Sequence, residues 1–225
     1  MKSYDYYYLA KRNILPDADK RNRVVGTIEK SSRVHVSAVC GKAMASIACM
    51  LKEYGCSVTG SDVKFSPPMS DVLDSHGITR LAPSLENLEN VDVLVVGNAL
   101  GPDAPEVAGA RDQKIPMISG AEAVSQIFSD KRAFVVTGTH GKTTTSALLT
   151  HVFTEAGKNP AYMIGGAFQK SNASYSMGNP STNTLILEGD EYNCAFFDRA
   201  PKFLRYHPTS VILTSLEHDH IDLYP

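Results

Sequence analysis

Short apolar runs, each ending at glycine or at polar residues, recur along the chain and predict β-strands. The first run covers 34–39 and the second covers 57–62. Between them, residues 45–54 have the length and pattern of a helix, and Gly55 directly after it is a common helix stop. A strand, a helix and a strand at this spacing predict a βαβ unit with parallel strands.

The same alternation of apolar and amphipathic segments continues to the end of the chain. Further strands are predicted at 91–96, 115–118, 133–136, 161–164, 183–187 and 209–214, and further helices at 67–76, 121–128 and 142–157. Residues 169–183 are rich in serine, asparagine, glycine and proline, which predicts a loop. Strands that alternate with helices predict an α/β fold with mostly parallel sheets.

A polar hinge at 129–132 divides this pattern into two parts. We predict a Rossmann-like domain over 33–129 and a second α/β domain over 130–225. Residues 1–32 are rich in tyrosine and then in charged residues. They are expected to form an N-terminal extension that is packed on the first domain or partly mobile.

The second predicted domain opens with a glycine-rich turn between a strand and a helix. Its pattern, Gly138-x-x-Gly141-Lys142-Thr143, is shorter than the general phosphate-binding P-loop, which would have a glycine where Val136 stands. Glycines let backbone N–H groups approach a ligand, and the helix N-terminus and the lysine favour an anion. The turn therefore favours a nucleotide phosphate over the alternative of an ordinary strand–turn–helix connection.

Three predicted strands of this domain are followed by polar side chains suited to nucleotide chemistry. Lys142 and Thr143 follow the first strand, Glu188 and Glu191 follow the second, and His220 follows the third. The carboxyl ends of parallel strands meet at one sheet edge, so these groups are expected to converge. A hydroxyl, a carboxylate and an imidazole can hold Mg²⁺ beside a triphosphate. The alternatives are solvated acidic turns and a structural histidine.

The first predicted domain carries a weaker nucleotide signal. Asp62 follows the turn at Gly41 by about twenty positions, where a Rossmann domain binds a ribose hydroxyl. Ser37, Ala43 and Ala45 stand where a dinucleotide fingerprint would have more glycines. An NAD-dependent oxidoreductase therefore remains only as an alternative.

Composition limits the classes of partner. The chain has 225 residues, a formal net charge of −2 and 43% hydrophobic residues, which is typical of a globular protein. No apolar run approaches a membrane span, and the N-terminus lacks the apolar core of a secretory signal. Four scattered cysteines form no metal-binding spacing and indicate reduced thiols. We predict a cytoplasmic protein with neither a nucleic-acid nor a membrane partner.

Several motifs resemble those of the Mur ligases, a family that joins amino acids or peptides to UDP-N-acetylmuramate. Residues 135–145, 188–192 and 216–222 are similar to its ATP-domain motifs, and residues 35–41 and 58–62 are similar to its UDP-binding domain. The resemblance covers about residues 33 to 225. It implies a UDP-binding domain followed by a partial ATP-binding domain, ATP and Mg²⁺ as cofactors, and a reaction through an acyl phosphate.

The resemblance also implies roles for particular residues. Those implied in ATP binding are Gly138, Thr139, His140, Gly141, Lys142, Thr143 and Thr144. Those implied in UDP-sugar binding are Cys40, Gly41, Lys42, Ala43, Met44, Asp62 and Asn98. Those implied in catalysis are Lys142, Glu188 and His220, and those implied in metal binding are Thr143, Glu188 and His220.

Two branches of the family are candidates for this chain. One branch adds L-alanine, and the other adds the murein tripeptide L-alanyl-γ-D-glutamyl-meso-diaminopimelate during peptidoglycan recycling. Residues 67–70, 97–99 and 190–203 resemble the tripeptide branch, which has Tyr192 where the alanine branch has a serine. We therefore predict a tripeptide ligase, with the alanine ligase as the alternative.

The sequence departs from the family pattern in three respects. Serine and alanine replace usual glycines at Ser37, Ala45 and Ser46, and Gly189 replaces an alanine. The family also continues past the position of Pro225 into a third domain that holds the incoming amine. We therefore expect this chain alone to bind nucleotide weakly without turnover, and a non-catalytic nucleotide-binding fragment is a further alternative. The sequence leaves the oligomeric state open.

Overall fold

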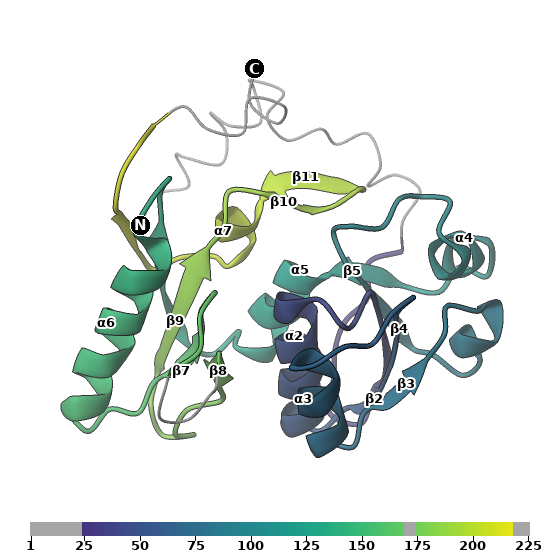
Figure 1. Cartoon of the computed structure of the whole chain (residues 1–225), viewed down its shortest axis with the longest axis horizontal. Coiled ribbons are helices and arrows are strands. Elements are labelled where there is room, and N and C mark those ends of the chain that lie inside the picture. Colours follow the sequence, from purple (N-terminus) through teal and green to yellow (C-terminus); the bar gives the residue numbers. More distant parts are fainter. Residues whose placement is uncertain (1–23, 169–173, 218–225) are drawn as a thin grey trace.

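The first half of the chain forms a five-stranded parallel sheet with helices on both faces (Figure 1). The computed structural model describes residues 24–168 and 174–217. The strands are β1 (Arg33–Ser37), β2 (Ser57–Ser61), β3 (Thr79–Leu81), β4 (Val93–Val96) and β5 (Met117–Ser119). The helices are α2 (Lys42–Tyr54), α3 (Met69–Ser75), α4 (Pro105–Asp112) and α5 (Gly120–Ile127), with the short 3₁₀ turn η2 (Leu85–Leu88). The strand order β3-β2-β1-β4-β5 reverses direction between β1 and β4, where open α/β sheets bind their ligands.

The second half forms another five-stranded sheet. Its strands are β6 (Arg132–Thr137), β7 (Ala161–Met163), β8 (Tyr175–Ser176), β9 (Thr184–Gly189) and β12 (Ser210–Leu213), in the order β12-β6-β9-β7-β8. β8 runs antiparallel to β7, and the other pairs are parallel. The remaining elements are α6 (Lys142–Glu155), α7 (Lys202–Arg205) and the hairpin of β10 (Asn193–Ala195) and β11 (Asp198–Pro201).

β12 lies at one edge of this second sheet and pairs with β6 on its inner side. Its apolar side chains are exposed, with Val211 at 51% and Leu213 at 56%. None of the helices within residues 24–168 and 174–217 is long and apolar enough to cross a membrane.

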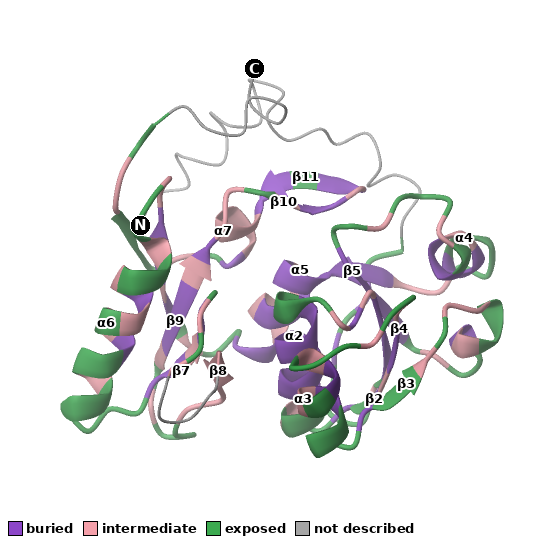
Figure 2. Cartoon of the chain, in the orientation of Figure 1, coloured by how far each residue is buried: buried purple, intermediate pink, exposed green. Residues whose placement is uncertain are grey.

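Alternating side chains of the first sheet pack into two apolar layers. β4 and β5 are buried along their whole length (Figure 2). Val36 and Val95 face α2 and α5 in one layer, whereas Leu94 and Val96 face α4 in the other. A strand covered on both faces needs apolar residues at consecutive positions, which explains the continuous run in β4.

The larger apolar layer also joins the two sheets. Val135 and Leu187 of the second sheet belong to the same buried cluster as the residues of α2 and α5. Two polar contacts reinforce this junction. The Tyr175 hydroxyl donates to Glu53 Oε1 at 2.7 Å, and the hydroxyls of Ser46 and Ser174 lie 2.9 Å apart. Ser46, a departure from the family glycine, therefore has a packing role here.

The described part of the predicted N-terminal extension lies against the first sheet. The Met117 N–H donates to the carbonyl of Val24 at 2.9 Å. The Gln126 side chain accepts from the Ile28 N–H at 2.7 Å and donates to the carbonyl of Gly26 at 3.0 Å. Residues 24–32 are thus fixed to β5 and α5, and residues 1–23 lie outside the described residues.

The predicted α/β class with mostly parallel sheets is confirmed. Several element boundaries were wrong. The first helix was predicted over 45–54, but it begins at Lys42 because Gly41 is its N-cap. The predicted loop 169–183 contains the short strand β8, which pairs antiparallel with β7. β3, α4 and the β10–β11 hairpin were not predicted, because they are short and lack a regular apolar period.

A buried polar cluster lies beneath α4. His35 is fully buried, and its Nε2 lies 3.2 Å from Glu106 Oε1. The Ser61 hydroxyl and the Asn87 amide also donate to this carboxylate, at 2.6 Å and 2.7 Å. Burial alone would raise the pKa of the Glu106 carboxyl, but the hydrogen bonds from His35, Ser61 and Asn87 together lower it.

This lowered pKa predicts a pH-dependent contribution of Glu106 to stability. The contribution is present above the ordinary pKa of 4.5 and is lost as the pH falls through the folded-state value. Glu106→Gln should cost about 1–3 kcal/mol of unfolding free energy at pH 7, and the cost should shrink below about pH 4. Urea unfolding at both pH values measures this, with the exposed Glu86→Gln as control. An equal cost at both pH values would contradict the role of the charge.

Candidate nucleotide and sugar-nucleotide sites

The second sheet brings three strand ends to one edge. β6 lies between β9 and β12, and it pairs in parallel with both. In this register Thr137 is opposite Gly189 on one side and Leu213 on the other. The segments that follow the three strands therefore leave the sheet together, as the sequence pattern predicted.

The glycine turn after β6 packs closely against the segment after β12. Gly138 has a φ of +129°, and a Cβ there would lie 2.4 Å from Thr214 Oγ1. The N–H groups of Thr139 and His140 donate to the Ser215 carbonyl and hydroxyl, at 3.1 Å and 2.9 Å. These two amides are therefore engaged by the protein itself. The N–H groups of the first turn of α6, which have no partner within a helix, remain suited to an anion.

Lys142 is folded back over this turn. Its Nζ donates to the carbonyls of Gly138 and Thr139, at 2.8 Å and 3.2 Å, and lies 2.9 Å from Glu191 Oε2. An ammonium group has three N–H donors, so these contacts use all of them. Only 16% of the side chain is exposed. A phosphate that binds Lys142 must therefore compete with ligands supplied by the chain.

Glu188 lies beside Thr143 at the end of β9. The Thr143 hydroxyl donates to Glu188 Oε1 at 2.9 Å, and the Gly165 N–H donates to Oε2 at 2.7 Å. A Cβ at Gly165 would lie 2.8 Å from Glu188 Oε1, so a larger residue there would displace the carboxylate. A hydroxyl and a carboxylate at this distance are oxygen donors of the kind that Mg²⁺ prefers, so the pair fits a magnesium ion.

The third predicted metal ligand, His220, lies outside the described residues. Within residues 24–168 and 174–217, no group of three or more His, Cys, Asp or Glu side chains could hold a metal ion. The predicted magnesium site is thus represented in the described structure by Thr143 and Glu188.

The two glutamates at the end of β9, Glu188 and Glu191, have different neighbours. Glu188 contacts Thr143, whereas Glu191 contacts Lys142. Asp190, between them, accepts from Lys202 Nζ at 2.8 Å. This arrangement favours Glu188 over Glu191 as the predicted metal ligand.

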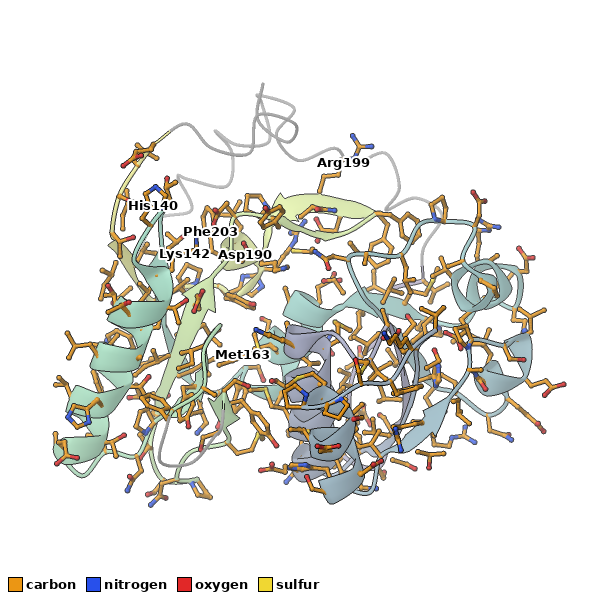
Figure 3. All side chains as sticks on the ribbon, viewed as in Figure 1. His140, Lys142, Met163, Asp190, Arg199 and Phe203 are labelled. Carbon is orange, nitrogen blue, oxygen red and sulfur yellow. The ribbon has the colours of Figure 1, made fainter. Side chains whose placement is uncertain are left out.

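The remaining predicted ATP-binding residues lie at the N-terminal end of α6. Figure 3 labels His140 and Lys142 there. Thr144 is exposed in the first helical turn. The His140 side chain is 69% exposed, and its Nε2 lies 3.5 Å from Glu217 Oε2. The structure thus brings His140 near the segment after β12 rather than near Glu188.

At the first sheet, the predicted UDP-sugar residues surround the switch in strand order. The Cys40 N–H donates to Asp62 Oδ2 at 2.9 Å, so Asp62 fixes the turn after β1. A Cβ at Gly97 would lie 2.9 Å from that of Ala38, which brings the loops after β1 and β4 into contact. Asn98 is exposed beside this contact.

The other predicted residues of this site are divided between surface and core. Gly41, Lys42 and Ala43 are exposed at the start of α2. Met44 is buried in the apolar layer, so its side chain faces the core and not the turn surface. Ser37, a further departure from the family glycine, is fully buried and donates to the carbonyl of Val95 at 3.2 Å.

A pocket of about 600 Å³ opens beside Asp62 at the ends of β2 and β3. Its lining consists of Asp62, Val63, Phe65, Asp74, Ile78, Thr79, Arg80, Leu81 and Ala82. Within it, the Arg80 guanidinium lies 5.3 Å from the Phe65 ring centre and 2.8 Å from Asp74. The pocket therefore offers an apolar face and polar groups next to Asp62, a predicted binding residue for the sugar nucleotide.

Sequence reasoning missed several of these residues. Gly165 directly follows the predicted strand 161–164, and its position beside β9 was the missing information. Phe65 and Arg80 were not singled out because β3 was not predicted. Ser215 gave no signal, since a single serine after a strand is common.

A sheet edge that gathers a glycine turn, a lysine, a hydroxyl and a carboxylate is an arrangement that α/β proteins use to bind nucleotide phosphates. Two family models match the chain. The model described as "Mur ligase family, catalytic domain" matches residues 33–132, and the model described as "Mur ligase middle domain" matches residues 136–225. The chain belongs to the Mur ligase family.

Named relatives include members of both branches. The chain is 36% identical over 197 residues to the UDP-N-acetylmuramate–L-alanyl-γ-D-glutamyl-meso-2,6-diaminoheptandioate ligase of Escherichia coli K12, covering 85% of this chain and 42% of the relative. It is 34% identical over 206 residues to the UDP-N-acetylmuramate–L-alanine ligase of a Psychrobacter species, covering 91% of this chain and 41% of the relative.

Solved structures give a similar result. A tripeptide ligase from Neisseria meningitides, named for the same L-alanyl-γ-D-glutamyl-meso-diaminopimelate substrate, matches with a TM-score of 0.81 and 32% identity. That match covers 87% of this chain and 64% of the other. An alanine ligase from Thermotoga maritima matches with a TM-score of 0.73 and 27% identity, covering 85% and 43%. This chain therefore spans less than half the length of the curated relatives described here.

The contact between Lys142 and Glu191 predicts an effect on nucleotide affinity. Glu191→Gln removes a negative charge that competes with phosphate for Lys142, so ATP should bind about 5- to 10-fold more tightly. Calorimetric titration with ATP and Mg²⁺ measures this. Glu155→Gln, an exposed site at the other end of α6, is the matched control. Weaker binding by Glu191→Gln would show instead that the carboxylate helps to hold the nucleotide.

Proposed function

We propose that the protein containing this chain is an ATP-dependent ligase of peptidoglycan recycling. It would join the tripeptide L-alanyl-γ-D-glutamyl-meso-diaminopimelate to UDP-N-acetylmuramate through an acyl phosphate. The observation that carries this proposal is the convergence of Lys142, Thr143 and Glu188 at one sheet edge. The printed names of the Escherichia coli and Neisseria relatives support the choice of substrates.

The residues of this chain would act mainly by positioning and by neutralising charge. The first-turn amides of α6 would bind the triphosphate, and Lys142 would move from Glu191 to the β- and γ-phosphates. Thr143 and Glu188, with His220 from outside the described residues, would hold Mg²⁺, which supplies further neutralisation of phosphate charge when bound.

The proposed reaction has two displacement steps. A carboxylate oxygen of the muramyl lactyl group attacks the γ-phosphorus of ATP, and ADP leaves with its bonding electrons. The tripeptide amine then attacks the acyl carbon, loses a proton and displaces inorganic phosphate. Keeping water from the acyl phosphate would require enclosure of the site during the reaction.

UDP-N-acetylmuramate is assigned in this proposal to the first sheet. The pocket beside Asp62 would receive the uridine, and the turn at Cys40 and Gly41 with the α2 N-terminus would receive the diphosphate. Asn98 lies on the adjacent loop. This site, the absence of nucleic-acid and membrane partners, and a cytoplasmic location are all part of the proposal.

The alanine ligase is the second candidate, because one relative at 34% identity carries that name. The sequence of residues 190–203, which forms the hairpin of β10 and β11, favours the tripeptide branch. A ligation assay on the complete protein that contains this chain separates the two. We expect kcat/KM to be at least about 100-fold higher with the tripeptide than with L-alanine. The reverse preference would overturn the assignment.

Lys142→Ala in that complete protein should abolish acyl-phosphate formation while leaving the fold intact. The lysine would stabilise charge that develops on the transferred phosphoryl group, so its loss should cost at least about 1000-fold in rate. Single-turnover release of phosphate measures the step, and circular dichroism checks folding. Lys158→Ala, an exposed lysine beyond α6, is the control. Unchanged phosphate release by Lys142→Ala would defeat the assignment.

A further inference from the structure

Residues 190–206, here called the bridging segment, leave the second sheet and reach across to the first. The segment contains the hairpin of β10 and β11 and the short helix α7. In Figure 1 the hairpin extends from α7 over β5 towards α4. It begins two residues after Glu188, so its starting point lies at the predicted ATP site.

The tip of the hairpin is anchored in the first sheet. Ala195 is fully buried and Phe197 is 4% exposed, and both belong to the apolar cluster that contains Leu94 and Val96 of β4. The Phe196 ring packs edge to face on Phe197, with ring centres 5.0 Å apart. Burying an aromatic side chain in another sheet resists relative movement of the two sheets.

The same cluster includes side chains beside the predicted sugar-nucleotide site. Leu100 and Ala104 pack against it, and they follow Asn98 in the loop after β4. The hairpin tip therefore shares an apolar cluster with residues of this loop. One face of the loop is available to a ligand, since Asn98 is exposed.

The base of the hairpin is fixed to the predicted ATP site by charge pairs. Lys202 Nζ donates to Asp190 Oδ2 at 2.8 Å, next to Glu191. Arg205 binds both oxygens of Asp198, at 2.6 Å and 2.7 Å, with 11% and 4% of the two side chains exposed. A bidentate, largely buried pair holds its partners in one geometry. Movement of the hairpin would therefore displace the acidic residues after β9.

We propose that the bridging segment couples the two nucleotide sites, with Phe197 as a positioning residue that holds the sugar-nucleotide loop in a fixed relation to the ATP turn. This inference rests on the proposed function, because it assumes that both ligands bind. Phosphate bound to Lys142 changes the contacts of Glu191 beside Asp190, and the segment transmits this shift to the loop after β4, so that binding at one site favours binding at the other. Such coupling is reciprocal.

The test measures affinity for UDP-N-acetylmuramate on this 225-residue chain by calorimetry, with and without a saturating non-hydrolysable ATP analogue and Mg²⁺. For the wild-type chain we expect the analogue to tighten sugar-nucleotide binding about 5- to 20-fold. The coupling ratio is the affinity for UDP-N-acetylmuramate with the analogue divided by the affinity without it. Phe197→Ala should reduce this ratio to about 1–2, while each ligand alone binds within about threefold of wild type. Phe197→Leu, which keeps an apolar anchor, should retain most of the ratio.

Arg199→Ala is the matched control, because Arg199 is exposed on the same hairpin and points away from the protein (Figure 3). It should leave the ratio unchanged. Circular dichroism tests the fold of each variant. Arg205→Lys, which breaks the bidentate pair without emptying the core, should also lower the ratio, and it decides the matter if Phe197→Ala does not fold.

The two proposals fail in different ways. If neither ligand binds the wild-type chain, the assignment of the two ligand sites to this chain fails. If both bind but the wild-type ratio is near one, or if folded Phe197→Ala and Arg205→Lys keep the wild-type ratio, the coupling is wrong and the proposed function stands. A purely structural role for Phe197 would lower stability without changing the ratio.

Discussion

The parallel pairing of β6 with β9 and β12 is the constraint on which the candidate ATP site depends. Each of the three strands leads into a segment that carries only part of the site. The pairing register places these segments side by side. Thr143 meets Glu188 because α6 begins beside the end of β9. A slip of one residue in β9 would turn Glu188 to the opposite face of the sheet and separate this pair.

Segments can approach one another closely at this sheet edge because several positions are glycines. Gly165 admits the Glu188 carboxylate, and Gly138 admits the segment after β12. Gly189 is a third case, because a Cβ there would lie 2.5 Å from Val135 Cγ1 and 2.7 Å from Phe203 Cβ. The family motif has an alanine at this position. In this chain an alanine there would clash, because neighbouring side chains occupy the space of its Cβ.

The sequence allowed the fold class and the converging strand ends to be predicted, because long apolar runs and glycine turns are local signals. Contacts between segments distant in the chain were less accessible. The division of roles between Glu188 and Glu191 depends on which of Thr143 and Lys142 each faces, and spacing alone left it open. The hairpin tip at Phe197 was missed because its apolar partners belong to the other sheet. The roles of the individual site residues stay predictions.

The outer edge of the second sheet has a consequence for handling the protein. Within the described residues, β12 has a neighbour on one side only, so the backbone N–H and C=O groups of its other side are open to pairing. Exposed valine and leucine side chains flank these groups. Such an edge can accept an added strand, from the same polypeptide or from another molecule. When this chain is handled by itself, the edge at β12 is therefore the place to guard against unwanted strand pairing.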